Sequence, residues 1–178
     1  MTHHPIVTDI RFLQPEDTEQ YLQLRMEGLQ VNPESFGTTY EETFQMDDLV
    51  ESWKKRLMPS SEVFTMGAFQ EDRLISVATF VRESKFKFQH KGTIFGVYTT
   101  PTHRGQGVAK KLMQSLLDKI SQSEGLEQVN LTVNAQNVIA IALYRSLGFE
   151  VFGTEKNAMK YEGKYWDENF MKLFIGEK

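Results

Sequence analysis

The sequence of 178 residues contains no cysteine. This absence excludes disulfide bonds, a thiolate nucleophile and cysteine-ligated metal sites. The sequence also has no excess of basic residues, because its 20 Lys and Arg are outnumbered by 24 Asp and Glu, which gives a formal net charge of −4. Without an overall basic field, nucleic acid and anionic membrane surfaces are disfavoured as partners.

Long apolar runs and a secretion signal are also missing from the sequence. No stretch approaches the roughly 20 apolar residues that span a bilayer, and the N-terminal residues lack a basic segment followed by an apolar one. We therefore expect a cytoplasmic protein. The composition, 40% hydrophobic and 25% charged, is typical of globular proteins. The length suits one compact domain, so we expect residues 1–178 to form a single domain.

The spacing of apolar residues predicts a series of strands and helices. In chain order these are a strand over 6–13, a helix ending at Asn32, a helix from Asp48 to just before Pro59, strands over 63–69 and 74–81, a strand over 93–99, a helix over 108–120, a strand over 129–133, a helix over 138–147 and strands over 149–152 and 170–175. We expect Asp48 and Glu51 to form a capping box. The helix over 138–147 is apolar on most faces, which predicts burial. The order predicts an α/β (α+β) fold, a mixed central sheet flanked by helices.

A glycine-containing turn joins the fourth predicted strand to the helix that follows it. Such a turn can hold a phosphate, because the first N–H groups of a helix lack internal partners and lie at the positive end of its dipole. Gly105 and Gly107 let a pyrophosphate approach the backbone. Positive charge nearby comes from Arg104, Lys110 and Lys111. The turn therefore predicts a phosphate-binding site.

Two common phosphate loops do not match this turn. The nucleotide P-loop needs a Gly-Lys pair followed by Ser or Thr, four residues after a first glycine, and the turn has none. The dinucleotide motif needs a third glycine at the position of Lys110. A P-loop site and a nicotinamide site are therefore disfavoured.

The turn instead resembles the cofactor loop of the GCN5-related N-acetyltransferase (GNAT) family, which reads Arg or Gln, two residues, Gly, one residue, and Gly or Ala. Arg104, Gly107 and Ala109 occupy these positions. A second segment is similar to the family's distal pattern of Asn, Ala, Leu-Tyr and Gly-Phe. It consists of Asn137, Ala140, Leu143, Tyr144, Leu147, Gly148 and Phe149. The resemblance covers residues 92–153, and the elements before them fit the family's N-terminal half.

This resemblance implies the GNAT fold and acetyl-CoA as the acyl donor. In the family, the loop amides hold the CoA pyrophosphate and the preceding strand offers its backbone to the pantetheine arm. The cofactor-binding residues implied in this chain are Val97, Tyr98, Thr99, Arg104, Gly105, Gln106, Gly107, Val108, Ala109, Lys110 and Asn137. For Asn137, capping the following helix is a fully plausible alternative.

The resemblance also implies a catalytic role for Tyr144, whose hydroxyl the family places beside the thioester sulfur. With an ordinary pKa near 10, the hydroxyl stays protonated at neutral pH and can donate to the departing CoA thiolate. A core tyrosine with a satisfied hydroxyl is the alternative. The implied activity is acyl-CoA-dependent N-acyl transfer, from acetyl-CoA to a primary amine, directly through a tetrahedral intermediate and without a metal.

The base that deprotonates the acceptor has several candidates. An ammonium cannot attack a thioester, so a carboxylate or a water relay must take a proton. Many family members carry an acidic residue on the strand before the cofactor loop. This chain has Val97, Tyr98 and Thr99 there, none of which is acidic. Glu83, Glu41 and Glu42 are candidates, and each could equally be a surface carboxylate.

We expect the acceptor to be an amine of a small molecule, a peptide or a protein. The resemblance is compatible with transfer of acetyl or of another short acyl group. It is also compatible with a monomer or a homodimer. A non-catalytic acetyl-CoA-binding sensor or interaction module is the alternative function. His90 and His103 receive no catalytic role, and His3 and His4 lack a convincing set of metal ligands.

Overall fold

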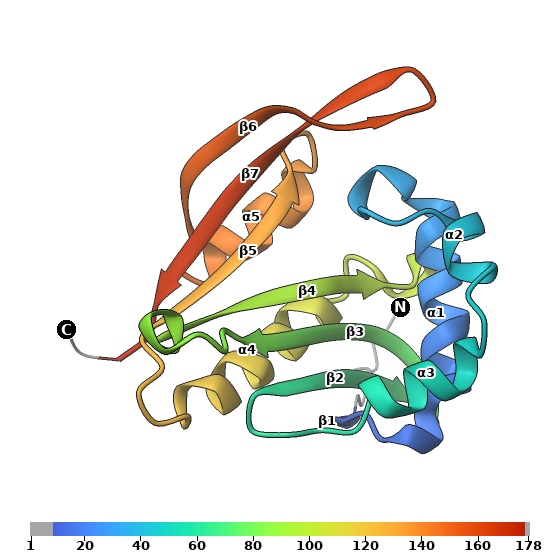
Figure 1. Ribbon diagram of the computed structural model, residues 1–178, viewed down its shortest axis with the longest axis horizontal. Coiled ribbons are helices and arrows are strands. Elements are labelled where there is room, and N and C mark those ends of the chain that lie inside the picture. The colour runs from blue at the N-terminus through green and yellow to red at the C-terminus, as the bar shows by residue number, and fades with distance from the viewer. Residues whose placement is uncertain (1–8, 177–178) are drawn as a thin grey trace, which may run out of the picture.

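The computed structural model describes residues 9–176 and contains a seven-stranded sheet in the order β1-β2-β3-β4-β5-β7-β6 (Figure 1). The strands are β1 (Asp9–Phe12), β2 (Val63–Gln70), β3 (Arg73–Arg82), β4 (Lys91–Thr99), β5 (Gln128–Asn134), β6 (Glu150–Tyr161) and β7 (Lys164–Phe174). β4 and β5 run parallel, and the other neighbouring pairs are antiparallel. The predicted mixed sheet is therefore confirmed.

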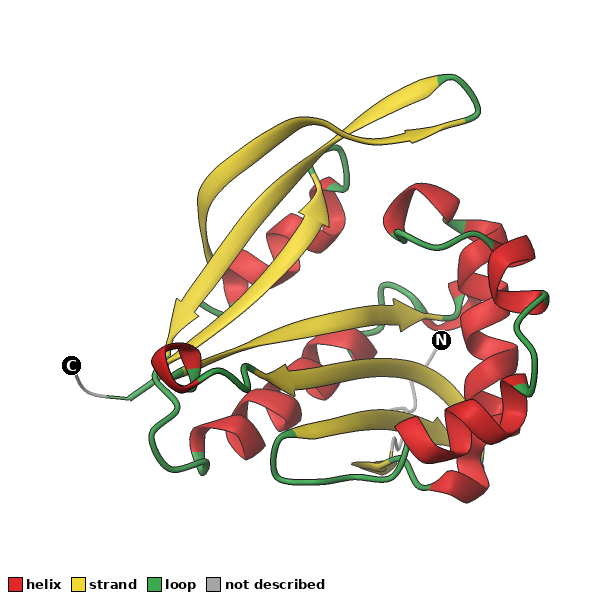
Figure 2. Ribbon diagram, viewed as in Figure 1, coloured by secondary structure: helices red, strands yellow, loops and turns green. Residues whose placement is uncertain are grey.

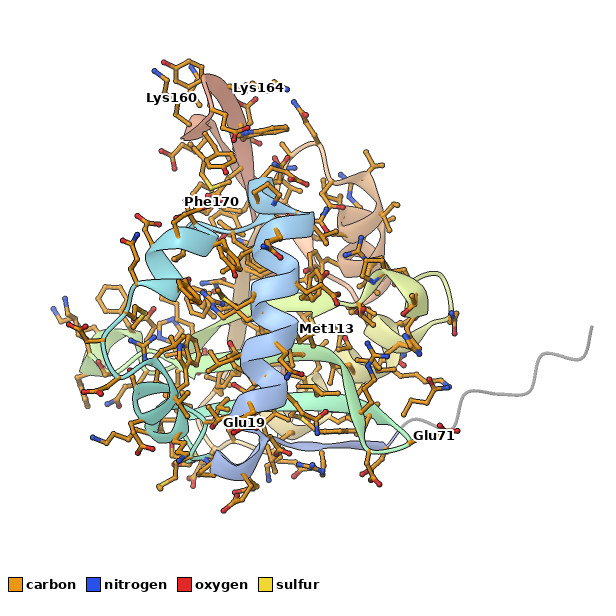
Figure 3. All side chains as sticks on the ribbon, turned by 90° about the vertical axis from the view of Figure 1, so that its right-hand side faces the viewer. Glu19, Glu71, Met113, Lys160, Lys164 and Phe170 are labelled. Carbon is orange, nitrogen blue, oxygen red and sulfur yellow. The ribbon has the colours of Figure 1, made fainter. Side chains whose placement is uncertain are left out.

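Five α-helices accompany the sheet within the described residues (Figure 2). They are α1 (Thr18–Val31), α2 (Tyr40–Phe44), α3 (Leu49–Arg56), α4 (Val108–Ser121) and α5 (Val138–Ser146). Short 3-10 turns cover Pro15–Asp17, Pro33–Ser35, Phe86–Phe88 and Pro101–His103. Figure 3 looks onto α1, which lies in front of the strands. This arrangement confirms a sheet flanked by helices.

Two clusters of buried side chains form on opposite faces of β3, because successive residues of a strand point to opposite sides. Val77 joins the cluster that includes Tyr21 and Leu24 of α1. Phe80 joins a larger cluster with side chains of α4, α5, β5 and β7. The larger cluster therefore fixes the C-terminal arm of the sheet, β5 to β7, on the N-terminal arm.

The two arms of the sheet diverge between β4 and β5. Pairing joins these strands only at Lys91–Thr93 and Gln128–Asn130 within the described residues. Beyond this point the strands separate, and the sheet opens like a V (Figure 1). A bulge in β4 adds to the opening, since Val77 pairs with Tyr98 but Thr79 pairs with Phe95. Gly96, with a φ of +60°, lies in the bulge.

The predicted capping box at Asp48 is wrong. Asp48 has a left-handed φ of +50° and its side chain makes no cap hydrogen bond. The same type of box forms at the short helix α2, in a stretch for which no helix was predicted. Thr39 Oγ1 accepts a hydrogen bond from the N–H of Glu42 at 3.1 Å, and the N–H of Thr39 donates to Glu42 Oε2 at 2.8 Å. The box satisfies backbone groups that a single helical turn cannot.

The C-terminal part departs from the prediction in two further ways. Helix α5 is not buried on most faces, because Val138 and Ile139 in its first turn are 70% and 82% exposed. Strands β6 and β7 are much longer than predicted, since their outer halves form a hairpin with both faces largely exposed. An exposed hairpin needs no alternation of apolar residues, so the sequence pattern carries no signal for it. The predicted residues 6–8 of the first strand lie outside the described residues.

Candidate functional site

A cavity of about 920 Å³ lies where β4 and β5 separate. Its walls come from both arms of the sheet and from the segments around them. They are residues 32–37 after α1, residues 94–99 of β4, the loop and helix start around residues 103–110, residues 131–134 of β5, the inner side of α5, and Trp166 and Glu168 of β7. The size is in the range of cavities that enclose small ligands.

The predicted phosphate loop forms one end of this cavity. Gly105 and Gly107 have left-handed φ values of +71° and +77°, and a Cβ added to either would meet no heavy atom of the described residues within 4 Å. Gly107 is the N-cap of α4 and offers no side chain to the first N–H groups of the helix. These groups therefore face open space beside Lys110, which suits a pyrophosphate.

Arg104 is engaged within the protein. Its Nε donates to the carbonyl of Thr99 at 2.9 Å, and its Nη2 donates to Asn32 Oδ1 at 2.9 Å. The guanidinium also lies over the Tyr98 ring, 5.3 Å from the centroid. Arg104 therefore ties the loop to the end of β4 and to the end of α1. Gln106 is the one predicted cofactor residue that does not line the cavity.

Strand β4 presents an unpaired backbone edge to the cavity from Ile94 onward, as far as the described residues show. The side chain of Tyr98 packs on α1, where its hydroxyl donates to Glu27 Oε1 at 2.9 Å. Burial, together with Glu27, raises the pKa of Tyr98 to about 12. The hydroxyl of Thr99 shares a 2.7 Å hydrogen bond with Ser76. These contacts hold β4 in place and leave its edge available to the amides of a pantetheine arm.

Tyr144 lies on the inner side of α5 and lines the cavity, with 6% of its surface exposed. Burial raises the pKa of its hydroxyl to about 12. Its ring packs edge-on against Phe149, with 6.1 Å between the centroids. Among the described residues no hydrogen-bond partner is present for the hydroxyl. A satisfied core tyrosine is therefore not what the structure contains.

Asn137 caps α5, because its Oδ1 accepts a hydrogen bond from the N–H of Ala140 at 3.1 Å. The helix cap, which the sequence offers as the alternative role of Asn137, is therefore present. Asn137 also lines the cavity, and its side-chain amide donors have no partner among residues 9–176. Capping and a contact to a bound molecule are compatible, since they use different atoms of the amide.

The predicted base candidates do not line the cavity. Glu83 lies just beyond the end of β3, and Glu41 and Glu42 belong to α2, where Glu42 serves the capping box. Glu34 and Glu168 line it instead. Glu168 is missed by the sequence pattern because it falls in the unpredicted part of β7.

The surroundings of Glu168 perturb its carboxyl group. Burial, and then the negative charge of Glu155 opposite it on β6, raise the pKa of its carboxyl group. The two ring nitrogens of His103 are both engaged, with Gln70 at 2.6 Å and Thr102 at 2.9 Å. His90 is not part of the cavity wall, and His3 and His4 lie outside the described residues.

Residues 9–176 contain no cluster of three or more His, Cys, Asp or Glu side chains that could hold a metal ion. They also contain no helix with the length and apolar character needed to cross a membrane.

The sheet opens between two parallel strands, and an open glycine turn lies before the helix that follows the first of them, an arrangement that suits a coenzyme with a pyrophosphate. The chain belongs to the Acetyltransferase (GNAT) family, whose model matches residues 28–149, more than half of the chain. It is therefore an N-acetyltransferase with acetyl-CoA as the acetyl donor.

Among characterised proteins, the chain is similar to the L-amino acid N-acetyltransferase AaaT of Escherichia coli. The two are 24% identical over 155 residues, which cover 87% of this chain and 92% of that protein. It is also 31% identical over 84 residues to the L-methionine sulfoximine/L-methionine sulfone acetyltransferase of Pseudomonas aeruginosa. That match covers 47% of this chain and 48% of that protein.

Solved structures share the fold over almost the whole chain. A GNAT-family acetyltransferase from Streptococcus pneumoniae gives a TM-score of 0.82 at 20% identity, covering 95% of this chain and 99% of that one. The yncA protein of Salmonella typhimurium, solved with its cofactor acetyl-CoA, gives a TM-score of 0.81 at 22% identity, covering 96% and 95%. These likenesses agree with the predicted GNAT fold.

Proposed function

We propose that this protein transfers the acetyl group of acetyl-CoA directly to a primary amine inside the cavity between β4 and β5, and that one domain carries the whole reaction. The observation that carries the proposal is that one cavity joins an open glycine turn at Gly105 and Gly107 to Tyr144, a largely buried residue whose hydroxyl has no partner among the described residues. This turn, which we call the phosphate cradle, fits a pyrophosphate, and the open edge of β4 fits the amides of the pantetheine arm.

In this proposal Tyr144 donates a hydrogen bond to the thioester sulfur as the carbon–sulfur bond breaks. Complete proton transfer from a hydroxyl with a pKa of about 12 to a thiolate of ordinary pKa near 8.5 is uphill by about 5 kcal/mol. Burial in the same site also disfavours the thiolate, which narrows this gap. Tyr144 therefore acts first by stabilising the developing charge on sulfur and then by supplying its proton.

We assign the base role to Glu168. The pKa of Glu168 is raised above that of an ordinary glutamate, so its carboxylate is a stronger base and accepts a proton from an ammonium more readily. The ammonium loses one proton to Glu168, and the neutral nitrogen then forms the new bond to the acetyl carbon. As the carbon–sulfur bond breaks, the nitrogen loses its second proton, which balances the proton that Tyr144 gives to sulfur, so that the products are an amide and CoA as the thiol. No covalent bond to the protein is needed, since no cysteine is present to form a thioester.

The names of the relatives describe amine acceptors of several sizes. AaaT acts on L-amino acids, and another relative acetylates an alanine of ribosomal protein bS18. We propose that the acceptor of this protein is likewise an amine of a small molecule or of a peptide. Acetyl transfer is favoured over a purely sensory role because the cavity combines an acid, the Tyr144 hydroxyl, with a carboxylate of raised pKa, that of Glu168.

Two measurements test this function. Acetyl-CoA should raise the melting temperature with a saturable dependence on its concentration, because a ligand that binds the native state stabilises it. A panel of primary amines should then contain members that release free CoA thiol with formation of the acetylated product. Binding of acetyl-CoA without acetylation of any amine would show a sensor, and no binding at all would remove the cavity assignment.

A further inference from the structure

Arg25 is a cavity residue that the transfer mechanism does not use. It lies on α1, and its side chain reaches the cavity wall. Asn32, which contacts Arg104 of the cofactor loop, follows seven residues later, or about 10 Å along the helix axis. Arg25 is therefore well separated from the phosphate cradle, and we regard it as part of the acceptor side of the cavity.

The positive charge of Arg25 is incompletely satisfied within the protein. Its Nε is buried and donates to no acceptor among the described residues. Arg11 and Arg82 each pair with a carboxylate, whereas Arg25 forms no ion pair in residues 9–176. An unsatisfied buried donor on a charged group costs stability, so its retention in a ligand cavity calls for an acceptor from outside.

Stacking holds the guanidinium of Arg25 in a defined orientation. Its central carbon lies over the Trp53 ring of α3, 5.1 Å from the centroid. Arg56 approaches the same ring at 4.9 Å and adds positive charge. Burial raises the pKa of Tyr21, and the charge of Arg25 together with its hydrogen bond to the Tyr21 hydroxyl offsets part of that rise, so Tyr21 is a polar neighbour of the guanidinium but leaves its charge without a carboxylate. A planar guanidinium held in this way presents a fork of N–H groups that matches a carboxylate.

The same cavity wall carries negative charge, because Glu168 on β7 and Glu34 after α1 both line it. The wall also includes the aromatic residues Phe36 and Trp166. The cavity therefore offers one cation, carboxylates and an apolar surface, a combination that complements a molecule carrying both an ammonium and a carboxylate.

We propose that the acceptor is a small zwitterion of the amino-acid type, whose carboxylate pairs with Arg25 while its amine is directed toward Glu168. This inference rests on the proposed acetyl transfer and names its acceptor class. A peptide N-terminus lacks a carboxylate next to its amine and would leave Arg25 unpaired. Selection for the zwitterion then follows from the penalty of leaving the partly buried Arg25 guanidinium, with its buried Nε, without a carboxylate.

The first experiment compares free L-amino acids with their carboxamides as acceptors of acetyl from acetyl-CoA. Phenylalanine, methionine and leucine with their amides form suitable pairs, since the amide keeps the side chain and removes the negative charge. The amide also has a lower amine pKa, so kcat/KM is calculated for the unprotonated amine of each compound. We expect kcat/KM to be about 100-fold higher for the acid of a productive pair than for its amide. Equal values for acid and amide, or a preference for amides, would overturn the carboxylate contact while leaving acetyl transfer intact.

The second experiment uses variants. Arg25→Gln should reduce the ratio of kcat/KM for acid over amide to about one, with acetyl-CoA affinity unchanged, and Arg25→Lys should restore part of the ratio. Arg56→Gln is the matched control, because Arg56 stacks on the same ring but does not line the cavity, and it should keep the ratio. Loss of the ratio in Arg56→Gln to the same degree would assign the effect to the Trp53 stack and overturn the proposal.

Binding gives a readout independent of turnover. With CoA in place of acetyl-CoA, titration calorimetry should detect the amino acid but not its amide in the wild type, and neither in a folded Arg25→Gln variant. Undiminished binding of the amino acid to that variant would contradict the inference. Acetyl-CoA binding without acetylation of acids, amides or other amines would instead show that the proposed function itself has failed.

Discussion

The guanidinium of Arg104 donates a hydrogen bond to Asn32 Oδ1 at 2.9 Å, which joins the cofactor loop to the end of α1. From there the chain continues into Glu34, whose backbone carbonyl accepts a hydrogen bond from Asn134 Nδ2 at 3.1 Å. The segment after α1 is therefore attached to the cofactor loop on one side and to β5 on the other. Hydrogen bonds therefore connect the cofactor loop to the segment after α1, which lines the same cavity.

A double-mutant cycle should measure the first of these links. Arg104→Gln and Asn32→Ala each remove the contact, so their effects on the free energy of unfolding should be non-additive by about 0.5–1.5 kcal/mol. Urea unfolding of the wild type, both single variants and the double variant provides the values. Additive effects would mean that the hydrogen bond contributes nothing measurable to the fold.

Gly107→Ala should weaken acetyl-CoA binding by at least about 10-fold, because a methyl group would occupy the open side of the phosphate cradle. The left-handed φ of +77° also costs about 1–2 kcal/mol of stability for any residue with a Cβ. Gly163→Ala is a matched control, since Gly163 has a φ of +78° with equally open surroundings but lies in the β6–β7 turn. Calorimetric titration of both folded variants should show weak binding only for Gly107→Ala, and equal affinities would contradict the cradle.

Tyr144→Phe should lower single-turnover acetyl transfer by about 100-fold to 10,000-fold while leaving acetyl-CoA affinity nearly unchanged. The hydroxyl has no partner among the described residues, so its removal should not destabilise the fold. Rapid mixing of the acetyl-CoA-saturated variant with a productive amine measures the step directly. Wild-type rates would leave Tyr144 with a packing role against Phe149.

Glu168→Gln should make the protein less active but more stable at neutral pH. Because the folded-state pKa of Glu168 is raised, its ionised carboxylate disfavours the folded state above the unfolded pKa of about 4.3. The stability penalty grows as the pH rises through the folded pKa and disappears as the pH falls below the unfolded value. The gain in melting temperature of Glu168→Gln should therefore be largest near neutral pH and vanish in acid.

Activity provides the second readout for Glu168. Loss of the base should lower kcat/KM by about 100-fold or more. Glu155→Gln removes the neighbouring negative charge that helps to raise the pKa of Glu168, so the acidic limb of the pH–rate profile should move to lower pH. An unchanged rate in Glu168→Gln would refute its role as a base, whatever happens to the melting temperature.

The cofactor side of the site is predictable from sequence because local geometry creates it. Gly105 and Gly107 mark left-handed positions directly before a helix, and an asparagine in the position of Asn137 predicts a cap. These features need only a few neighbouring residues to form. The positions of most strands and of α4 along the chain follow from apolar periodicity, which is likewise a local property of the sequence.

The acceptor side is not predictable in this way, because it depends on contacts between distant parts of the chain. Arg25 is an ordinary helix residue in the sequence, and only the packing of α1 on α3 shows that its Nε is left without a partner. Glu168 reaches the cavity through the pairing of β7 with β5, where it lies opposite Asn134. Neither position carries a local signal, so the base candidates chosen from the sequence do not include the carboxylates that line the cavity.

The position of β7 in the sheet has a consequence for how the protein is made. The final strand of the described chain does not lie at an edge but is inserted between β5 and β6, and it pairs with β5 from Gln128 to Asn134. A nascent chain that has not yet released residues 164–174 from the ribosome therefore has a β5 that can pair only with β4, at Gln128–Asn130, and it lacks Glu168 in the cavity. Because long-range strand pairing is slow, the part of the cavity that contains Glu168 should form after the glycine turn and the start of α4 during synthesis.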